Sequence, residues 1–143
     1  MHDDILVPTD GSDASAVAVD EAIEIADREQ TTVHFLHVVD AGTEMSAGAS
    51  GSIAPQLTES LEAQAESALD EAANRADRAG VNYDRTTLEG DPHEVIAEYS
   101  TGHDIDLIVM GASGRSGLKE HLLGSTTDRV VRTVETSVLI ARP

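Results

Sequence analysis

Residues 106–126 read DLIVMGASGRSGLKEHLLGST, an apolar run that leads directly into a loop punctuated by glycine. The run from Leu107 to Met110 is short and uninterrupted, as expected for a strand buried on both faces of a parallel sheet. Gly111, Gly114 and Gly117 remove side chains where the backbone turns, so that N–H groups can approach a ligand closely. We therefore expect a buried strand and a loop able to hold a phosphate, with a flexible connection as the alternative.

A helix is predicted directly after this loop. Ser125 and Thr126 follow Gly124, and their hydroxyls are expected to cap a helix that runs through Val130 and Val131. Because the N–H groups and the dipole at a helix N-terminus favour negative charge, an anion is expected there.

The glycine spacing differs from the better-known phosphate loops. A Walker loop places lysine directly after a glycine, whereas Lys119 follows a leucine, and the dinucleotide fingerprint Gly-x-Gly-x-x-Gly is absent. The spacing present is Gly111, two residues, Gly114, nine residues, and then Gly124 and Ser125.

Strands and helices alternate along the chain. We predict five strands, at Asp4–Val7, Thr32–Val39, Tyr83–Leu88, Leu107–Met110 and Ser137–Ala141. Helical patterns lie between them, at Ala14–Arg28, Leu57–Ala79, Asp91–Ser100 and from Ser125 onward. This alternation predicts an α/β fold of the flavodoxin or Rossmann type, an open five-stranded parallel sheet in the order 3-2-1-4-5 with helices on both faces. Residues 1–143 are expected to form a single domain.

Two turn-rich segments converge in this fold. In open α/β sheets, ligands bind at the carboxyl ends of the strands where the strand order reverses. The segments Pro8–Ser12 and Gly111–Gly117 follow the two strands that flank this point, so we expect them to share one crevice. Asp10 is expected either to accept hydrogen bonds from a sugar or base, or to form the turn beside Gly11.

The composition is strongly acidic. The chain has 27 acidic and 9 basic residues, a formal net charge of −18 and a pI near 4.3, which disfavours nucleic acid as a partner. It has no cysteine, no membrane-length apolar run and no signal-like segment, so we expect a cytoplasmic protein without membrane association. The excess of carboxylates is typical of halophilic adaptation to a salty cytosol.

An ordered set of motifs resembles one known family. The motifs are Ile5-Leu-Val-Pro-Thr-Asp-Gly-Ser12, Leu36-His-Val-Val39, Gly90-Asp-Pro92, Asp106-Leu-Ile-Val-Met-Gly111 and the glycine spacing that follows. Together they cover essentially the whole chain and resemble the universal stress protein family, specifically its ATP-binding branch.

This resemblance implies a set of ATP contacts. The adenosine end would lie near Pro8, Thr9, Asp10 and the backbone of Val39. Met110 and Gly111 would border the ribose, and the phosphates would be held by Gly114, Gly124, Ser125 and Thr126. Because the chain has so little positive charge, we expect Mg2+ to be held through the phosphates and not by a dedicated protein cage.

Several other residues are left with alternatives. Arg115, Lys119 and His121 either approach the phosphates or are solvated loop residues, and residues 40–55 form either a connector or a flap over the ligand. His34 and His37 are three apart on a predicted strand and point to opposite faces, so packing or surface roles are expected and not a metal pair.

Three functions follow from these expectations. The favoured one is an ATP-binding regulatory stress protein without catalytic residues, in which ATP occupancy changes the state of a dimer or partner. The others are a slow ATPase or phosphotransfer enzyme and a partner-binding scaffold that binds no nucleotide. A homodimer is expected through the uncharged edge-strand segment Val138–Ile140, as the resemblance also implies.

The acidic composition predicts a dependence of stability on salt. Carboxylates spread over the helix faces repel one another, and the Debye length falls from about 10 Å at 0.1 M salt to about 3 Å at 1 M. Thermal unfolding in a KCl series should therefore show a midpoint that rises well beyond physiological ionic strength. An unchanged midpoint between low and multimolar KCl would contradict the halophilic interpretation.

Overall fold

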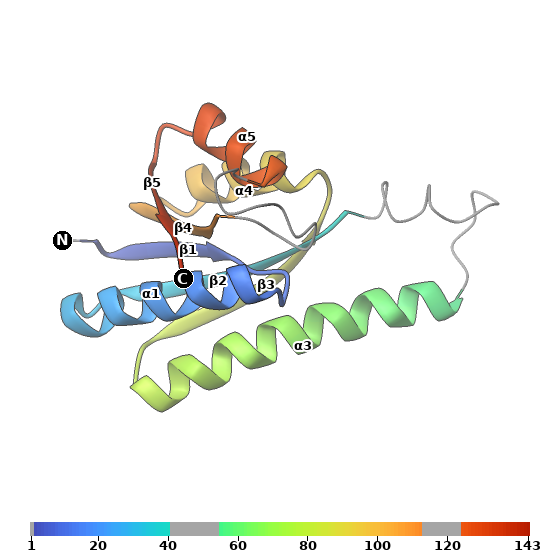
Figure 1. Cartoon of the computed structure of the whole chain (residues 1–143), viewed down its shortest axis with the longest axis horizontal. Helices are drawn as coiled ribbons and strands as arrows, with labels where there is room; N and C mark the ends of the chain where they lie inside the picture. Colours follow the sequence, from blue (N-terminus) through green and yellow to red (C-terminus); the bar gives the residue numbers. More distant parts are fainter. Residues whose placement is uncertain (1, 41–54, 113–123) are drawn as a thin grey trace.

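The computed structural model describes residues 2–40, 55–112 and 124–143. Five parallel strands form one sheet in the order β3-β2-β1-β4-β5, which confirms the predicted topology (Figure 1). The strands are β1 (Asp4–Pro8), β2 (Thr32–Val39), β3 (Tyr83–Glu89), β4 (Leu107–Gly111) and β5 (Ser137–Ala141). The predicted strands match these bounds to within one residue at each end.

Helices cover both faces of the sheet. They are α1 (Asp13–Glu29), α3 (Pro55–Ala79), α4 (Pro92–Gly102) and α5 (Ser125–Thr133). In Figure 1, α1 and α3 lie on one face, and α4 and α5 lie on the other. None of the helices in the described ranges has both the length and the apolarity needed to cross a membrane.

Two apolar cores result from the alternation of side chains along each strand. Val7, Val33 and Phe35 belong to the core under α1 and α3. Leu6 and Leu36, one position along, belong to the core under α4 and α5. Because the central strands are buried on both faces, they read as continuous apolar runs and not as alternating patterns.

Helix α1 lies very close to the end of β4. A Cβ atom added at Gly111 would lie 2.5 Å from the carbonyl oxygen of Ala14 and 2.7 Å from its carbonyl carbon. Gly111 is buried in the strand and is not a loop residue. The close approach that requires glycine here is therefore made by α1.

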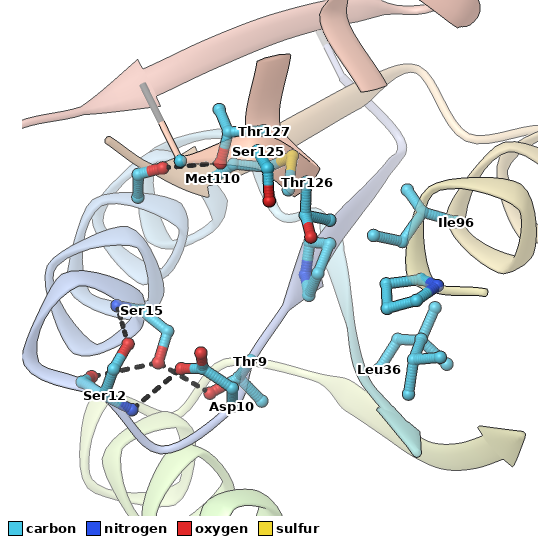
Figure 2. Close-up of a pocket in the computed structure, with 15 residues that line it drawn as sticks. Thr9, Asp10, Ser12, Ser15, Leu36, Ile96, Met110, Ser125, Thr126 and Thr127 are labelled. Carbon is cyan, nitrogen blue, oxygen red and sulfur yellow. Dashed lines mark hydrogen bonds between the residues drawn. The ribbon is translucent and has the colours of Figure 1, made fainter. Parts of the chain in front are cut away.

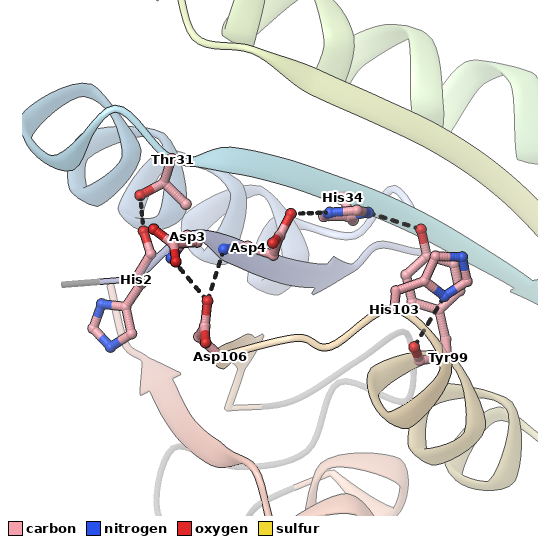
Figure 3. A network of polar contacts seen from close by, with 8 residues as sticks. All are labelled: His2, Asp3, Asp4, Thr31, His34, Tyr99, His103 and Asp106. Atoms are coloured by element: carbon pink, nitrogen blue, oxygen red, sulfur yellow. Dashed lines mark hydrogen bonds and ion pairs between the residues drawn. The ribbon is translucent and has the colours of Figure 1, made fainter.

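The amino end of the sheet is held by a polar network (Figure 3). The Asp106 carboxylate accepts hydrogen bonds from the backbone N–H groups of Asp3 and Asp4, at 2.8 and 2.9 Å. The bonds from Asp4 and then Asp3 lower the pKa of Asp106, so their contribution to stability is present above its ordinary pKa and is lost as the pH falls. His34 lies 2.9 Å from both Asp4 Oδ1 and Tyr99 Oη, which joins β1, β2 and α4.

The contact between α1 and Gly111 predicts a large effect of one methyl group. In Gly111→Ala the new Cβ would meet backbone atoms of Ala14, which yield only if α1 moves, so we expect a loss of about 1–3 kcal/mol in the free energy of unfolding. Gly102→Ala is the matched control because a Cβ at Gly102 meets no atom within 4 Å.

Urea unfolding at fixed KCl measures both variants against the wild type. We expect Gly102→Ala to lose no stability, since alanine in a helix costs less conformational entropy than glycine. Equal stability of the two variants would show that α1 does not pack against Gly111 as described.

Candidate functional site

A cavity of about 290 Å³ opens at the carboxyl ends of the central strands (Figure 2). Strands β1 and β2 stay paired as far as Pro8 and Leu36, whereas the pairing of β1 with β4 runs from Ile5↔Leu107 to Leu6↔Ile108. Beyond that point β1 and β4 diverge, as expected where the strand order reverses. The cavity therefore lies at the predicted switch point.

Its lining divides into an apolar part and a part rich in hydroxyl groups. The apolar side chains come from β1, β2, β4 and the first turns of α4, and they are Pro8, Leu36, Val38, Pro92, Ile96 and Met110. The hydroxyl groups come from the β1–α1 turn and the first turns of α1 and α5, and they belong to Thr9, Ser12, Ser15, Ser125, Thr126 and Thr127. An apolar surface beside a few polar groups is the usual composition of a small-molecule site.

The turn between β1 and α1 is held by its own side chains. The N–H of Ser12 donates to Asp10 Oδ1 at 2.9 Å, and Gly11 between them has φ +80°. Ser12 caps α1, because its Oγ accepts a hydrogen bond from the Ser15 N–H at 3.2 Å. Thr9 Oγ1 donates to Ser15 Oγ at 3.2 Å. Asp10 thus has the expected turn-forming role, and the hydroxyl groups beside it have fixed positions.

Helix α5 begins differently from the prediction. Its N-cap residue is Gly124, with φ −59°, and no side chain makes a cap hydrogen bond. The prediction that the hydroxyls of Ser125 and Thr126 cap the helix is therefore wrong. The Gly124 N–H instead donates to the Ala112 carbonyl at 2.8 Å, and Thr127 Oγ1 donates to the Gly111 carbonyl at 3.0 Å. These two bonds tie the start of α5 to the end of β4.

Most of the predicted ATP contacts lie around this one cavity. Its lining includes Pro8, Thr9, Asp10, Met110, Gly111, Gly124, Ser125 and Thr126. Val39 does not belong to the lining as described; it is buried, and its carbonyl accepts a hydrogen bond from the Gly90 N–H at 3.0 Å. Gly114 lies outside the described residues, as do Arg115, Lys119 and His121, and so does nearly all of the segment 40–55.

Seven further residues of the lining were not predicted as contacts. They are Ser12, Ser15, Leu36, Val38, Pro92, Ile96 and Thr127. Leu36 and Val38 could have been predicted as neighbours on one face of the sheet from the alternation along β2, because side chains two apart share a face. Ser12 ends the predicted turn-rich segment Pro8–Ser12, and its observed role is the N-cap of α1.

One group of possible metal ligands lies at the start of α4. Asp91, His93 and Glu94 each offer one ligand atom, and these atoms lie within 4.8 Å of one another. Asp91 is the N-cap residue but makes no side-chain cap hydrogen bond; its Oδ1 lies 2.6 Å from His93 Nδ1. The group is accounted for by this contact, and the N-terminus of a helix favours anions over cations.

The fold and the cavity define the class of protein: a doubly wound α/β protein with a cavity at its switch point. The profile of the universal stress protein family matches residues 1–142, and the chain belongs to this family. Universal stress protein MJ0531 of Methanocaldococcus jannaschii is 35% identical over 142 residues, covering 99% of this chain and 83% of the relative.

Solved structures agree with this assignment. Protein MJ0577 of the same organism superposes with a TM-score of 0.87 at 27% identity, covering 100% of this chain and 97% of that structure. A universal stress protein solved in complex with cAMP superposes with a TM-score of 0.71 at 29% identity, covering 99% and 97% of the two chains.

Proposed function

We propose that this protein binds ATP in the switch-point cavity and acts as a nucleotide-dependent regulatory stress protein. The observation that carries the proposal is that eight of the ten residues expected to contact ATP line a single cavity. The apolar side chains of β2 and α4 suit a nucleobase, and the hydroxyl-bearing start of α5 suits phosphates. The related protein in complex with cAMP supports a nucleotide as the class of ligand.

Mg2+ would accompany the nucleotide. Magnesium prefers oxygen ligands and is commonly bound through one or two carboxylates and the phosphates of its substrate. Among the described lining residues, Asp10 is the one carboxylate, and its Oδ1 already accepts the Ser12 N–H. The phosphates of the nucleotide would therefore supply most of the ligands of the ion, with hydroxyl groups such as those of Ser125 and Thr126 nearby.

A regulatory role fits this lining better than phosphoryl transfer. Transfer enzymes position a base, metal-binding carboxylates and often an arginine around the reacting phosphate. Asp10 is committed to the turn, and the other described polar side chains of the lining are hydroxyl groups. Among the described residues, this lining suits the binding of a nucleotide and holds no groups arranged to activate water.

The proposal makes Gly124 the most informative position for a substitution, because its proposed role depends on having no side chain. Gly124 is buried and lines the cavity, and its φ of −59° is accessible to valine, so Gly124→Val would act through bulk and not through backbone strain. We expect it to abolish measurable ATP binding. Ser125→Ala removes one hydroxyl and should weaken binding less, by about 1 kcal/mol.

Titration calorimetry with ATP and Mg2+ at matched high salt measures these effects. Gly102→Val is the control, because Gly102 ends α4 at the opposite end from the cavity and a Cβ there meets no atom within 4 Å. Unchanged circular dichroism separates lost binding from misfolding. If the wild type binds no ATP, or folded Gly124→Val binds as tightly as the wild type, the scaffold alternative is favoured.

We further propose that β5 forms a homodimer contact. The strand lies at one edge of the sheet, and its apolar residues Val138, Leu139 and Ile140 are half-buried. No charge lies within this segment to discourage pairing, although charged residues usually protect an exposed edge. β3 at the other edge carries Asp84, Arg85 and Glu89.

Sedimentation velocity tests the dimer. Leu139→Lys should shift the wild-type dimer toward monomer, because it places a charge in the contact strand. Leu139 also packs against the core under α1, so retained secondary structure must be checked. Leu88→Lys, on the opposite edge strand, is the control and should remain dimeric. A wild type that sediments as a monomer at tens of micromolar would contradict the proposal.

A further inference from the structure

His37 lies directly behind the turn that lines the cavity. It is 6% exposed and belongs to β2, and its position in the strand places it on the face covered by α1 and α3. Its Nδ1 lies 2.9 Å from the carbonyl oxygen of Thr9. A carbonyl oxygen only accepts hydrogen bonds, so Nδ1 carries the proton and donates it. His37 itself does not line the cavity; Thr9 does.

The Thr9 carbonyl stands where the β1–β2 ladder ends. The last paired residues are Pro8 and Leu36, and the Thr9 N–H makes a final backbone bond to the Leu36 carbonyl at 2.9 Å. Strand β1 then turns toward α1, so its next carbonyl lies beyond the ladder. The imidazole of His37 donates to this carbonyl in place of a backbone N–H, which satisfies a buried polar group.

This bond acts on one wall of the cavity. Strand β1 has already separated from β4 after Leu6, so the Thr9 turn is attached to the sheet from the β2 side. The opposite wall has a comparable attachment, because Thr127 Oγ1 donates to the Gly111 carbonyl at 3.0 Å. Without the His37 bond, the turn carrying Thr9 and Asp10 would lose one of its attachments to β2.

We propose that His37 is a positioning residue for the nucleotide site: its Nδ1–H fixes the Thr9 carbonyl and thereby the β1–α1 turn against which the ligand binds. The inference rests on the proposed function for its ligand, although the bond itself is independent of any ligand. This role depends on where the Nδ1–H group of His37 lies and not on the volume that its buried ring fills.

His34 provides an internal comparison on the same strand. It is also buried, at 7% exposure, and it makes hydrogen bonds through both ring nitrogens. Its partners, Asp4 and Tyr99, lie at the amino end of the sheet, as Figure 3 shows, and it faces α4. Loss of His34 should therefore lower stability without altering the cavity turn.

Substitution of His37 by asparagine or glutamine separates the effect of the donor's position from the effect of side-chain packing. The side-chain N–H of asparagine is as many bonds from the backbone as Nδ1, so His37→Asn can keep the bond to Thr9. The amide of glutamine extends one bond further, toward the position of Nε2, so His37→Gln should lose it. We expect His37→Gln to bind ATP with Mg2+ about tenfold more weakly, because a turn that has lost this hydrogen bond must be ordered when the ligand binds, and His37→Asn and His34→Asn to stay within about threefold of the wild type.

Amide hydrogen exchange at Thr9–Ser12 in the ligand-free protein is the second measurement. Exchange should quicken in His37→Gln and stay near the wild-type rate in His37→Asn. Equal affinity of the two His37 variants, or equal exchange at this turn, would overturn the positioning role. If the wild type binds no ATP, the proposed function fails, and the exchange comparison alone decides whether His37 holds the turn.

Discussion

The close approach of α1 to β4 is the constraint on which the site depends. The carbonyl oxygen of Ala14 lies 2.5 Å from where a Cβ of Gly111 would be, so the first helix and the fourth strand approach too closely for a side chain at this position. This contact brings the start of α1, with Ser12 and Ser15, beside the end of β4 and the start of α5. A larger residue at position 111 would separate the two halves that form the cavity walls. Glycine at position 111 is therefore required for the packing of α1 against β4, and the shape of the cavity follows from that packing.

The sheet could be predicted because its strands are buried on both faces. Continuous apolar runs such as Leu107–Met110, separated by helical patterns, predict the number, type and direction of the strands, and the flavodoxin-like arrangement of such a fold predicts their order. The site residues that lie at the carboxyl ends of strands could be predicted. Pro8, Thr9 and Asp10 lie directly after β1, and Met110 and Gly111 end β4, so each reaches the cavity through topology alone.

The remaining details depend on geometry that spacing does not encode. Ser125 and Thr126 are good capping residues by type, but the chain enters α5 one residue earlier, with the Gly124 N–H bonded to Ala112. Val38 lines the cavity, whereas Val39, whose backbone was expected near the adenosine, does not, and its carbonyl accepts a hydrogen bond from the Gly90 N–H. The role of His37 follows only from where β1 leaves the ladder. Sequence spacing correctly placed the two histidines on opposite faces, yet it could not assign partners to either.

The distribution of charge bears on how such a protein would hold a nucleotide. Arg75 pairs with Asp20 and Glu71, and Arg85 pairs with Asp70 and Glu66, so these scarce cations neutralise nearby carboxylates. Exposed pairs of this kind contribute little stability individually, and neither arginine lines the cavity. Under the proposed function, phosphates would enter a strongly negative protein and meet hydroxyl groups and the N-terminus of α5. A cation bound with the nucleotide, together with salt that screens the carboxylates, would then supply much of the compensation that lysine or arginine provides in less acidic proteins.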